Sequence, residues 1–314
     1  MLLMADTDYF VAEFRRITAG LKKRLLRKPN LQEVVEGYGS LSKKMASEEL
    51  PQYAALCSMA MAKAEKGMKN LVGEAVAWHD AGRLFLQAED SLHDLLIPSY
   101  KDHLIAAVQC YLIAIEVHVA NSKSSLAATL SLEIATALLR YEDYSEALRF
   151  YHKAAELLAD EEDGGYYHAV ELAVTCRLKL RDYQGVLKDI SGITQKIRKK
   201  INPRKQDHLL LQKCEVTQFL IILILQPPKN FLSTEYSQLL IRYSADVTSD
   251  DYLEPHMDEN IFIILQSLKI AIDQKDEDAK PRLKDELWPH LTSEQQKLLT
   301  LLIKVHDPHE YVIL

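Results

Sequence analysis

The sequence predicts an all-α fold made of antiparallel helix hairpins that stack into a solenoid. Gly and Pro number only 10 each among 314 residues, so few positions interrupt a helix. Hydrophobic residues make up 48% of the chain, which is typical of a folded protein and not of a disordered one. No stretch combines strict apolar–polar alternation with the turn signals of a strand.

The clearest hairpin runs from Ala128 to Ala159. It fits a tetratricopeptide (TPR) unit of 34 residues, with its turn near Tyr141–Asp143. Ala135 and Ala147 are small enough to let two helix axes approach closely. One hairpin cannot bury this surface alone, which implies stacked neighbours. The positions expected to face inward are Ile134, Ala135, Leu138, Tyr144, Ala147, Tyr151 and Ala154.

Two further units are predicted on either side of this hairpin. The earlier unit has Trp78, Gly82 and a following aromatic residue at TPR spacing. Its second helix carries Ala107 and Tyr111, with Ala107 25 residues beyond Gly82, where a TPR unit has about 12. The loop around Ile97–Ser99 is therefore an insertion. A degenerate third unit follows, with Ala173, Val174, Tyr183, Val186, Ile190 and Ile193 as its packing positions.

The N-terminal part is predicted to begin with a helix over Asp8–Leu26 that Pro29 stops. Helices over Leu31–Ser47 and Gln52–Gly67 follow it. The first helix has an apolar stripe at Phe10, Phe14, Ile17, Leu21 and Leu25, and a basic surface at Lys22, Lys23, Arg24, Arg27 and Lys28. A solvated end helix, an acidic partner and an anionic lipid surface all fit this pattern. No aromatic residues alternate with the basic ones, so nucleic acid is not expected.

The C-terminal part loses the TPR pattern and is acidic. Asp246–Leu314 contains 15 acidic and seven basic residues, whereas the whole chain has a net charge of −7. Such asymmetry affects partner choice and association rate. Helices are expected over Asp207–Gln226, Ser233–Asp246, Asp258–Gln274, Asp276–Pro289 and Thr292–His306. Six carboxylates of this region are predicted to bind a basic partner, and the alternative is that they are simply solvated. They are Asp250, Asp251, Glu254, Asp276, Glu277 and Asp278.

These patterns divide the chain into three segments. Residues 1–50 form the N-terminal basic helices, 51–205 the TPR-like repeats, and 206–314 an acidic helical region continuous with the solenoid. The apolar run Phe219–Leu225 is too short to span a bilayer and is interpreted as a buried helix. The N-terminus shows no secretory signal.

The sequence contains no recognisable chemical site. Nucleotide-binding, metalloprotease and serine-hydrolase motifs are absent. Cys57, Cys110, Cys176 and Cys214 lie far apart, as buried free thiols in a reducing compartment do. The chain is therefore expected to be a protein without enzymatic activity, metal or cofactor. A helical enzyme that lacks a recognisable motif is the alternative.

Three strings resemble the forty-kilodalton huntingtin-associated protein family, also called the factor VIII intron 22 protein family. They are LKKRLLRKPN at Leu21–Asn30, CEVTQFLIILILQPP at Cys214–Pro228 and LWPHLTSEQQKLL at Leu287–Leu299. The strings occur in the same order, and the resemblance extends from about residue 8 to residue 305. Vertebrate relatives carry a long Pro/Ala-rich segment where this chain has only Asn202–Asp207.

The resemblance implies a TPR-like scaffold that binds huntingtin, a large HEAT-repeat protein, as a 1:1 heterodimer. It further implies that the pair acts in early-endosome trafficking as an effector of a Rab GTPase. The expected location is the cytoplasm with an early-endosome pool, and a nuclear pool stays open. The alternative is a peripheral membrane adaptor that uses the helix Phe10–Lys28, with no membrane span.

Overall fold

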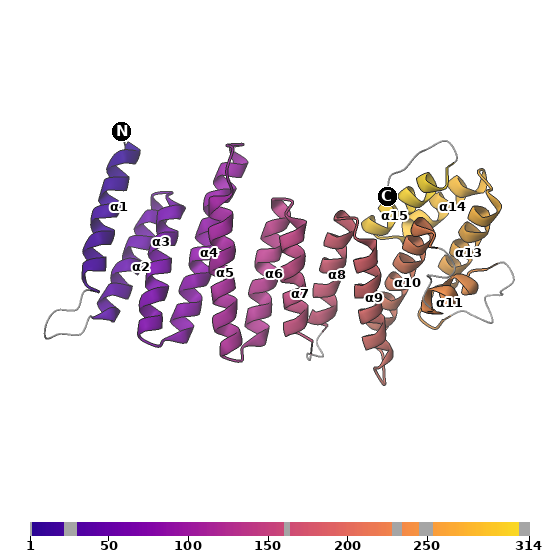
Figure 1. Ribbon diagram of the computed structural model, residues 1–314, viewed down its shortest axis with the longest axis horizontal. Helices are drawn as coiled ribbons and strands as arrows, with labels where there is room; N and C mark the ends of the chain where they lie inside the picture. Colours follow the sequence, from indigo (N-terminus) through magenta and orange to yellow (C-terminus); the bar gives the residue numbers. More distant parts are fainter. Residues whose placement is uncertain (1, 22–29, 160–163, 228–233, 245–253, 308–314) are drawn as a thin grey trace. The chain divides into compact units, whose positions relative to one another are not determined.

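The computed structural model consists of helices throughout the part that it describes (Figure 1). Fourteen α-helices and one 3-10 helix are seen there, and no strand, so the all-α prediction is confirmed. Contacts divide the chain into two compact units, Met1–Ala169 (unit 1) and Val170–Leu314 (unit 2). The three segments expected from the sequence stay a prediction. The described residues are 2–21, 30–159, 164–227, 234–244 and 254–307.

Unit 1 is a series of helices in which each one from α1 to α7 packs against the next in the sequence. Short connections join them, so neighbours run antiparallel, as in helix hairpins. Their bounds are α1 Leu2–Ala19, α2 Leu31–Ser47, α3 Pro51–Gly67, α4 Leu71–Asp94, α5 Asp102–Ala120, α6 Ser124–Arg140 and α7 Tyr144–Leu157; α8, Gly165–Lys179, begins in this unit.

Several helices of unit 1 begin at a side-chain cap that the local sequence supplies. Asn70 caps α4 by accepting a hydrogen bond from the Gly73 amide at 3.2 Å, and Asp143 caps α7 in the same way from Glu146. Pro51 stands at the first position of α3, where a missing amide hydrogen costs nothing. These caps fix where each hairpin turns.

Small side chains allow the hairpins of unit 1 to pack closely. Gly82 lies against the ring of Tyr111: a Cβ at residue 82 would be 2.6 Å from the Tyr111 Cδ2 atom. Trp78 is buried on the same helix, and Ala107 has no exposed surface. In the α6–α7 hairpin the buried residues include Ala135, Leu138, Ala147 and Tyr151.

The first helix differs from the prediction at both ends. It begins at Leu2 and ends at Ala19, well before Leu26. A turn follows, in which the Gly20 and Leu21 amides donate to the carbonyls of Ile17 at 2.9 Å and Thr18 at 3.0 Å. A Cβ at residue 20 would be 3.2 Å from the Val34 side chain. The apolar stripe belongs to the core, since Phe10 and Ile17 are buried with residues of α2 and α3, although Leu21 is exposed.

Unit 2 lacks the regular succession of hairpins. Helix α10 contacts α9, α11 and α15, and α14 contacts α13 and α15. The predicted capping box at the start of α15 is present, with Thr292 and Gln295 as its partners. The bounds are α9 Tyr183–Arg198, α10 Lys205–Leu225, α11 Thr234–Arg242, α13 Glu259–Gln274, α14 Ala279–Leu287, a 3-10 turn over Trp288–His290, and α15 Ser293–Val305.

Helix α10 of unit 2 contains the apolar run, and its residues from Phe219 to Ile224 are buried. By length and composition alone, α5 and α10 could each cross a membrane. Core helices of folded proteins share these properties, so the observation is weak. The burial agrees with the interpretation of Phe219–Leu225 as core. All four cysteines are buried as well, also as expected.

Candidate functional site

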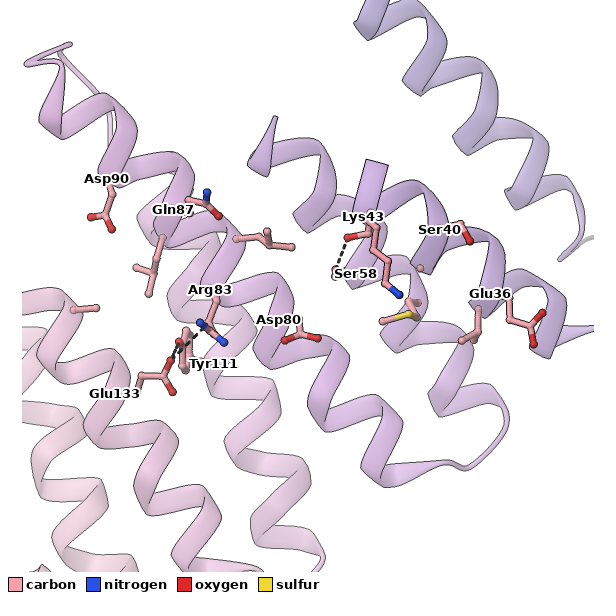
Figure 2. A pocket seen from close by; sticks show the side chains of 17 residues that line it. Glu36, Ser40, Lys43, Ser58, Asp80, Arg83, Gln87, Asp90, Tyr111 and Glu133 are labelled. Carbon is pink, nitrogen blue, oxygen red and sulfur yellow. Dashed lines mark hydrogen bonds and ion pairs between the residues drawn. The ribbon is translucent and has the colours of Figure 1, made fainter. Parts of the chain in front are cut away.

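A groove of about 1030 Å³ runs across one face of unit 1. It is formed mainly by α2, α4 and α6, which are every second helix of the series, with α3 and α5 behind them (Figure 2). This alternation follows from the hairpin arrangement, in which the first helices of successive hairpins share one face. The charged residues that line the groove are Glu36, Lys43, Asp80, Arg83, Asp90 and Glu133.

A hydrogen-bond network around Glu133 joins three of these helices. The Tyr111 hydroxyl of α5 donates to Glu133 Oε1 at 2.7 Å, and His79 Nε2 of α4 lies 2.9 Å from Oε2. Arg83 lies 3.9 Å away, and Figure 2 shows Arg83, Tyr111 and Glu133 converging from α4, α5 and α6. The carboxylate is therefore held in one position.

The same contacts determine the charge of this network. The hydrogen bond with His79, followed by that from Tyr111, lowers the pKa of Glu133 in spite of partial burial. Burial and the Glu133 bond raise the pKa of Tyr111. At neutral pH the groove thus contains an ionised carboxylate beside a protonated phenol, an arrangement suited to recognition of polar or basic groups.

The groove as a whole is more acidic than basic. Four carboxylates line it against the two cations Lys43 and Arg83. Asp90 is engaged by Arg140 at 3.2 Å and by the Tyr141 hydroxyl. Asp80 makes no ion pair with any residue that the structure describes. A basic ligand group would find at least one free carboxylate here.

The faces of α4 and α6 that line the groove continue into exposed aliphatic side chains. Val76 and Val72 lie one and two helical turns before Asp80 on α4, and Leu126 lies two turns before Glu133 on α6. All three are exposed. These three residues, an apolar strip, lie beside the acidic residues of the groove and do not line it, and exposed apolar residues next to charged ones are typical of protein-binding surfaces.

Unit 2 contains a second polar cluster, centred on Glu215, which sequence reasoning did not identify. Glu215 Oε1 accepts from Arg242 Nη1 at 2.9 Å and from the Tyr243 hydroxyl at 2.8 Å. Its Oε2 lies 2.8 Å from His256 Nε2. Burial alone would raise the pKa of Glu215, but His256, Arg242 and Tyr243 outweigh burial and lower it.

The Glu215 cluster is closed to solvent and so acts within the fold. Glu215, Tyr243 and His256 are all buried, and Arg242 also reaches Glu254 at 3.1 Å. One signal in the sequence points to it: a carboxylate in the middle of the apolar helix α10 requires buried partners. The partners themselves come from residues 27 to 41 positions away.

The carboxylates predicted to bind a partner have local roles where the structure describes them. Glu254 pairs with Arg242, and Glu277 pairs with Lys280 at 2.8 Å. Asp276 accepts hydrogen bonds from the amides of Asp278 and Ala279 and so orders the start of α14. Asp276, Glu277 and Asp278 are exposed. Their role in binding stays a prediction.

The remaining predicted site residues lie outside the described part of the chain. They are the acidic residues Asp250 and Asp251 and the basic residues Lys22, Lys23, Arg24, Arg27 and Lys28. Within the described part, no group of three or more His, Cys, Asp or Glu side chains could hold a metal ion.

Comparison with known proteins confirms the family resemblance. No protein-family model matches the chain. In an alignment 355 positions long, the chain is 29% identical to the 40-kDa huntingtin-associated protein of Mus musculus. The alignment covers 96% of this chain and 93% of that protein. The Rattus norvegicus protein of the same name gives the same values.

One solved structure is also similar along the chain. The crystal structure of the apo form of RapI is 12% identical and covers 95% of this chain and 96% of its own, with a TM-score of 0.27. A TM-score this low carries no argument about the fold.

Proposed function

Because the chain is a relative of the 40-kDa huntingtin-associated proteins over nearly its whole length, we propose that it is a non-enzymatic scaffold that binds huntingtin. The observation that carries the proposal is this full-length similarity to proteins named for that association. An alignment over 96% of the chain spans both units, so the proposal concerns the whole molecule.

The composition of the groove in unit 1 supports a protein partner. A segment with aliphatic and basic side chains would meet the strip of Val72, Val76 and Leu126 with the first kind and Asp80 and Glu133 with the second. Burying an apolar centre while charges pair at its edge is how specific protein interfaces are built. The acidic side of unit 2, with Asp278 exposed, adds long-range attraction for a basic surface.

The finer parts of the proposal extend from the family resemblance. The complex with huntingtin is a 1:1 heterodimer, and together the two proteins act as an effector of an early-endosomal Rab GTPase. The chain is then cytoplasmic, with a pool on early endosomes. A nuclear pool would require a separate observation.

Co-purification with quantified stoichiometry tests the proposal. The tagged chain is expressed with huntingtin of the same organism, and the eluate is measured by light scattering after size exclusion. We expect one copy of each protein in a complex that persists at moderate salt. A chain that is monodisperse alone and does not bind huntingtin would contradict the proposal.

Charge reversal in the groove tests where the partner binds. Glu36→Lys combined with Asp80→Lys is expected to weaken the complex at least tenfold, because it replaces two carboxylates with cations. Asp285→Lys combined with Glu286→Lys makes the same change in charge on exposed positions of unit 2. Equal loss with both variants would indicate general electrostatic steering and not a groove site.

A further inference from the structure

The connection between α4 and α5 exposes four large apolar side chains together. Leu95, Leu96, Ile97 and Tyr100 are 70%, 88%, 46% and 95% exposed. We call these four residues the apolar tip. Single exposed apolar residues are common on protein surfaces and need no explanation, but a cluster at one place marks an interaction site.

The apolar tip projects from its surroundings because α4 is longer than its neighbours. Helix α4 has 24 residues, whereas α3 and α6 have 17 each. At 1.5 Å per residue, α4 is longer by roughly 10 Å. Figure 1 shows the α4–α5 end reaching beyond the adjacent ends of α3 and α6. A partner can therefore reach the tip without touching the rest of the unit.

The backbone of the tip is held in a defined shape. The amides of Leu96 and Ile97 donate to the carbonyls of His93 at 3.0 Å and Leu92 at 2.9 Å. This pair of hydrogen bonds is typical of a helix C-terminal cap. On the other side, the Lys101 amide donates to Ser99 Oγ at 2.9 Å. These side chains are presented by ordered backbone, so binding does not have to order them first.

Leu96 adopts a conformation that a leucine does not favour. Its φ is 53°, in the left-handed region, where Gly or Asn is usual at the end of a helix. Eight other described non-glycine residues have positive φ, and all of them are polar or charged: Glu49, Lys69, Lys101, Ser122, Glu142, Arg181, Gln226 and Lys275. No packing within the chain offsets the energetic cost of this conformation, because the Leu96 side chain is almost fully exposed.

The charges around the tip distinguish between possible partners. Asp94 and Asp102 flank it, against Lys101 and the Arg140 that pairs with Asp94 at 2.5 Å. A loop that inserts into an anionic membrane needs a surplus of cations beside its apolar residues. The tip has no such surplus, which favours an apolar pocket on a protein.

We propose that the apolar tip inserts into an aliphatic pocket of the huntingtin partner and is an anchor of that complex. This inference rests on the proposed function. Leu96 and Tyr100, the two most exposed members, fill the pocket, and the Tyr100 hydroxyl stays at its edge, as amphipathic aromatic anchors do.

The test is an affinity measurement with Leu96→Ser combined with Tyr100→Ser in the full chain. Both side chains lie in solvent, so the variant keeps the wild-type melting temperature. We expect its Kd for huntingtin to rise by at least about tenfold, the scale of losing an interface anchor. The matched control is Ile201→Ser, which removes a side chain that is 95% exposed in unit 2, and it keeps wild-type affinity.

The outcomes separate this inference from the proposed function. Wild-type affinity in the tip variant overturns the inference and leaves huntingtin binding intact, whereas no binding by the wild-type chain overturns both. Two further measurements also count against it. Tip-dependent sedimentation with phosphatidylserine vesicles would assign the tip to lipid, and a tip-dependent dimer in light scattering would assign it to a second copy of the chain.

Discussion

The two units each fix a carboxylate with a tyrosine, a histidine and an arginine, yet they use it differently. In unit 1, Glu133 lies at the surface of a groove and is 39% exposed. In unit 2, Glu215 is 7% exposed, and Tyr243 and His256 are buried with it. The same kinds of side chain therefore form part of a groove surface in one unit and a buried hydrogen-bond cluster in the other, and the extent of burial distinguishes them.

The difference extends to how each unit packs. Unit 1 brings helices together through small residues such as Gly82 and Ala147, and most of its buried residues are apolar. Unit 2 surrounds the apolar helix α10 with irregularly placed helices and ties α11 and the Glu254–Met257 segment to it through Glu215. Removal of one side chain should therefore lower the free energy of unfolding most where that side chain is a buried charge.

The largest effect is expected from Glu215→Ala. The substitution removes the ion pair with Arg242 and leaves the buried Tyr243 and His256 side chains without the carboxylate that they contact, which costs about 3–5 kcal/mol. Chemical denaturation that follows the unfolding of unit 2 measures the loss. Glu254→Ala is the control, because this partner of Arg242 is 37% exposed and its pair contributes below about 1 kcal/mol. Similar losses in the two variants would show that burial does not separate them.

The second effect concerns close packing in unit 1. Gly82→Ala places a methyl group 2.6 Å from the buried Tyr111 ring, and we expect a net loss of about 1–2 kcal/mol after the gain in helix propensity. Gly39→Ala is the matched change on α2, where the new Cβ meets only Met61 Sδ at 3.7 Å. It should gain up to about 1 kcal/mol. Thermal denaturation compares the two, and stabilisation by both would contradict the close approach.

The third effect is a dependence on pH in unit 2. The pKa of Glu215 is lowered in the folded chain from its ordinary value of 4.5. Its contribution is therefore complete above about pH 4.5 and is lost as the pH falls toward the folded value. The melting difference between the wild-type chain and Glu215→Gln should shrink as the pH falls below about 4.5. If the difference in melting temperature instead grows on acidification, the ionised Glu215 carboxylate does not stabilise unit 2 through these partners.

The smallest effect separates stability from binding at the tip. Leu96→Gly removes the strain of a leucine at positive φ and should stabilise unit 1 by about 0.5–1 kcal/mol. Leu95→Gly makes the same change next to it, where φ is −84°, and should instead destabilise. Melting temperatures decide the signs. If Leu96→Gly also destabilises unit 1, the leucine side chain stabilises the fold. Its positive φ then does not support a role in binding a partner.

Unit 1 was more accessible to sequence reasoning than unit 2, for a physical reason. A repeat places Ala135 and Ala147 at fixed spacing, and the turn at Tyr141–Asp143 follows from the Asp143 cap, so local pattern determines the packing. The groove follows from the same repetition. However, its Glu133 network depends on His79 and Tyr111, which are 54 and 22 residues away.

The parts that could not be predicted depend on contacts distant in the sequence or on single backbone angles. Nothing near Glu215 indicates that His256 will meet it. Helix α1 ends at Ala19, where the Gly20 and Leu21 amides form turn hydrogen bonds, so the periodicity to Leu26 was misleading. The spacing of Gly82 and Ala107 indicated an insertion at Ile97–Ser99, but it did not indicate that Leu96 is exposed or that its φ is positive.

Gly82 couples the interior of unit 1 to its surface chemistry. The Tyr111 ring passes over the bare Cα of residue 82, and only from there does its hydroxyl reach Glu133 on α6. Gly82 does not line the groove, yet a larger side chain there would displace the phenol and remove one of the hydrogen bonds that hold the Glu133 carboxylate. A substitution at this buried position would thus change the geometry of the groove without changing any residue that lines it.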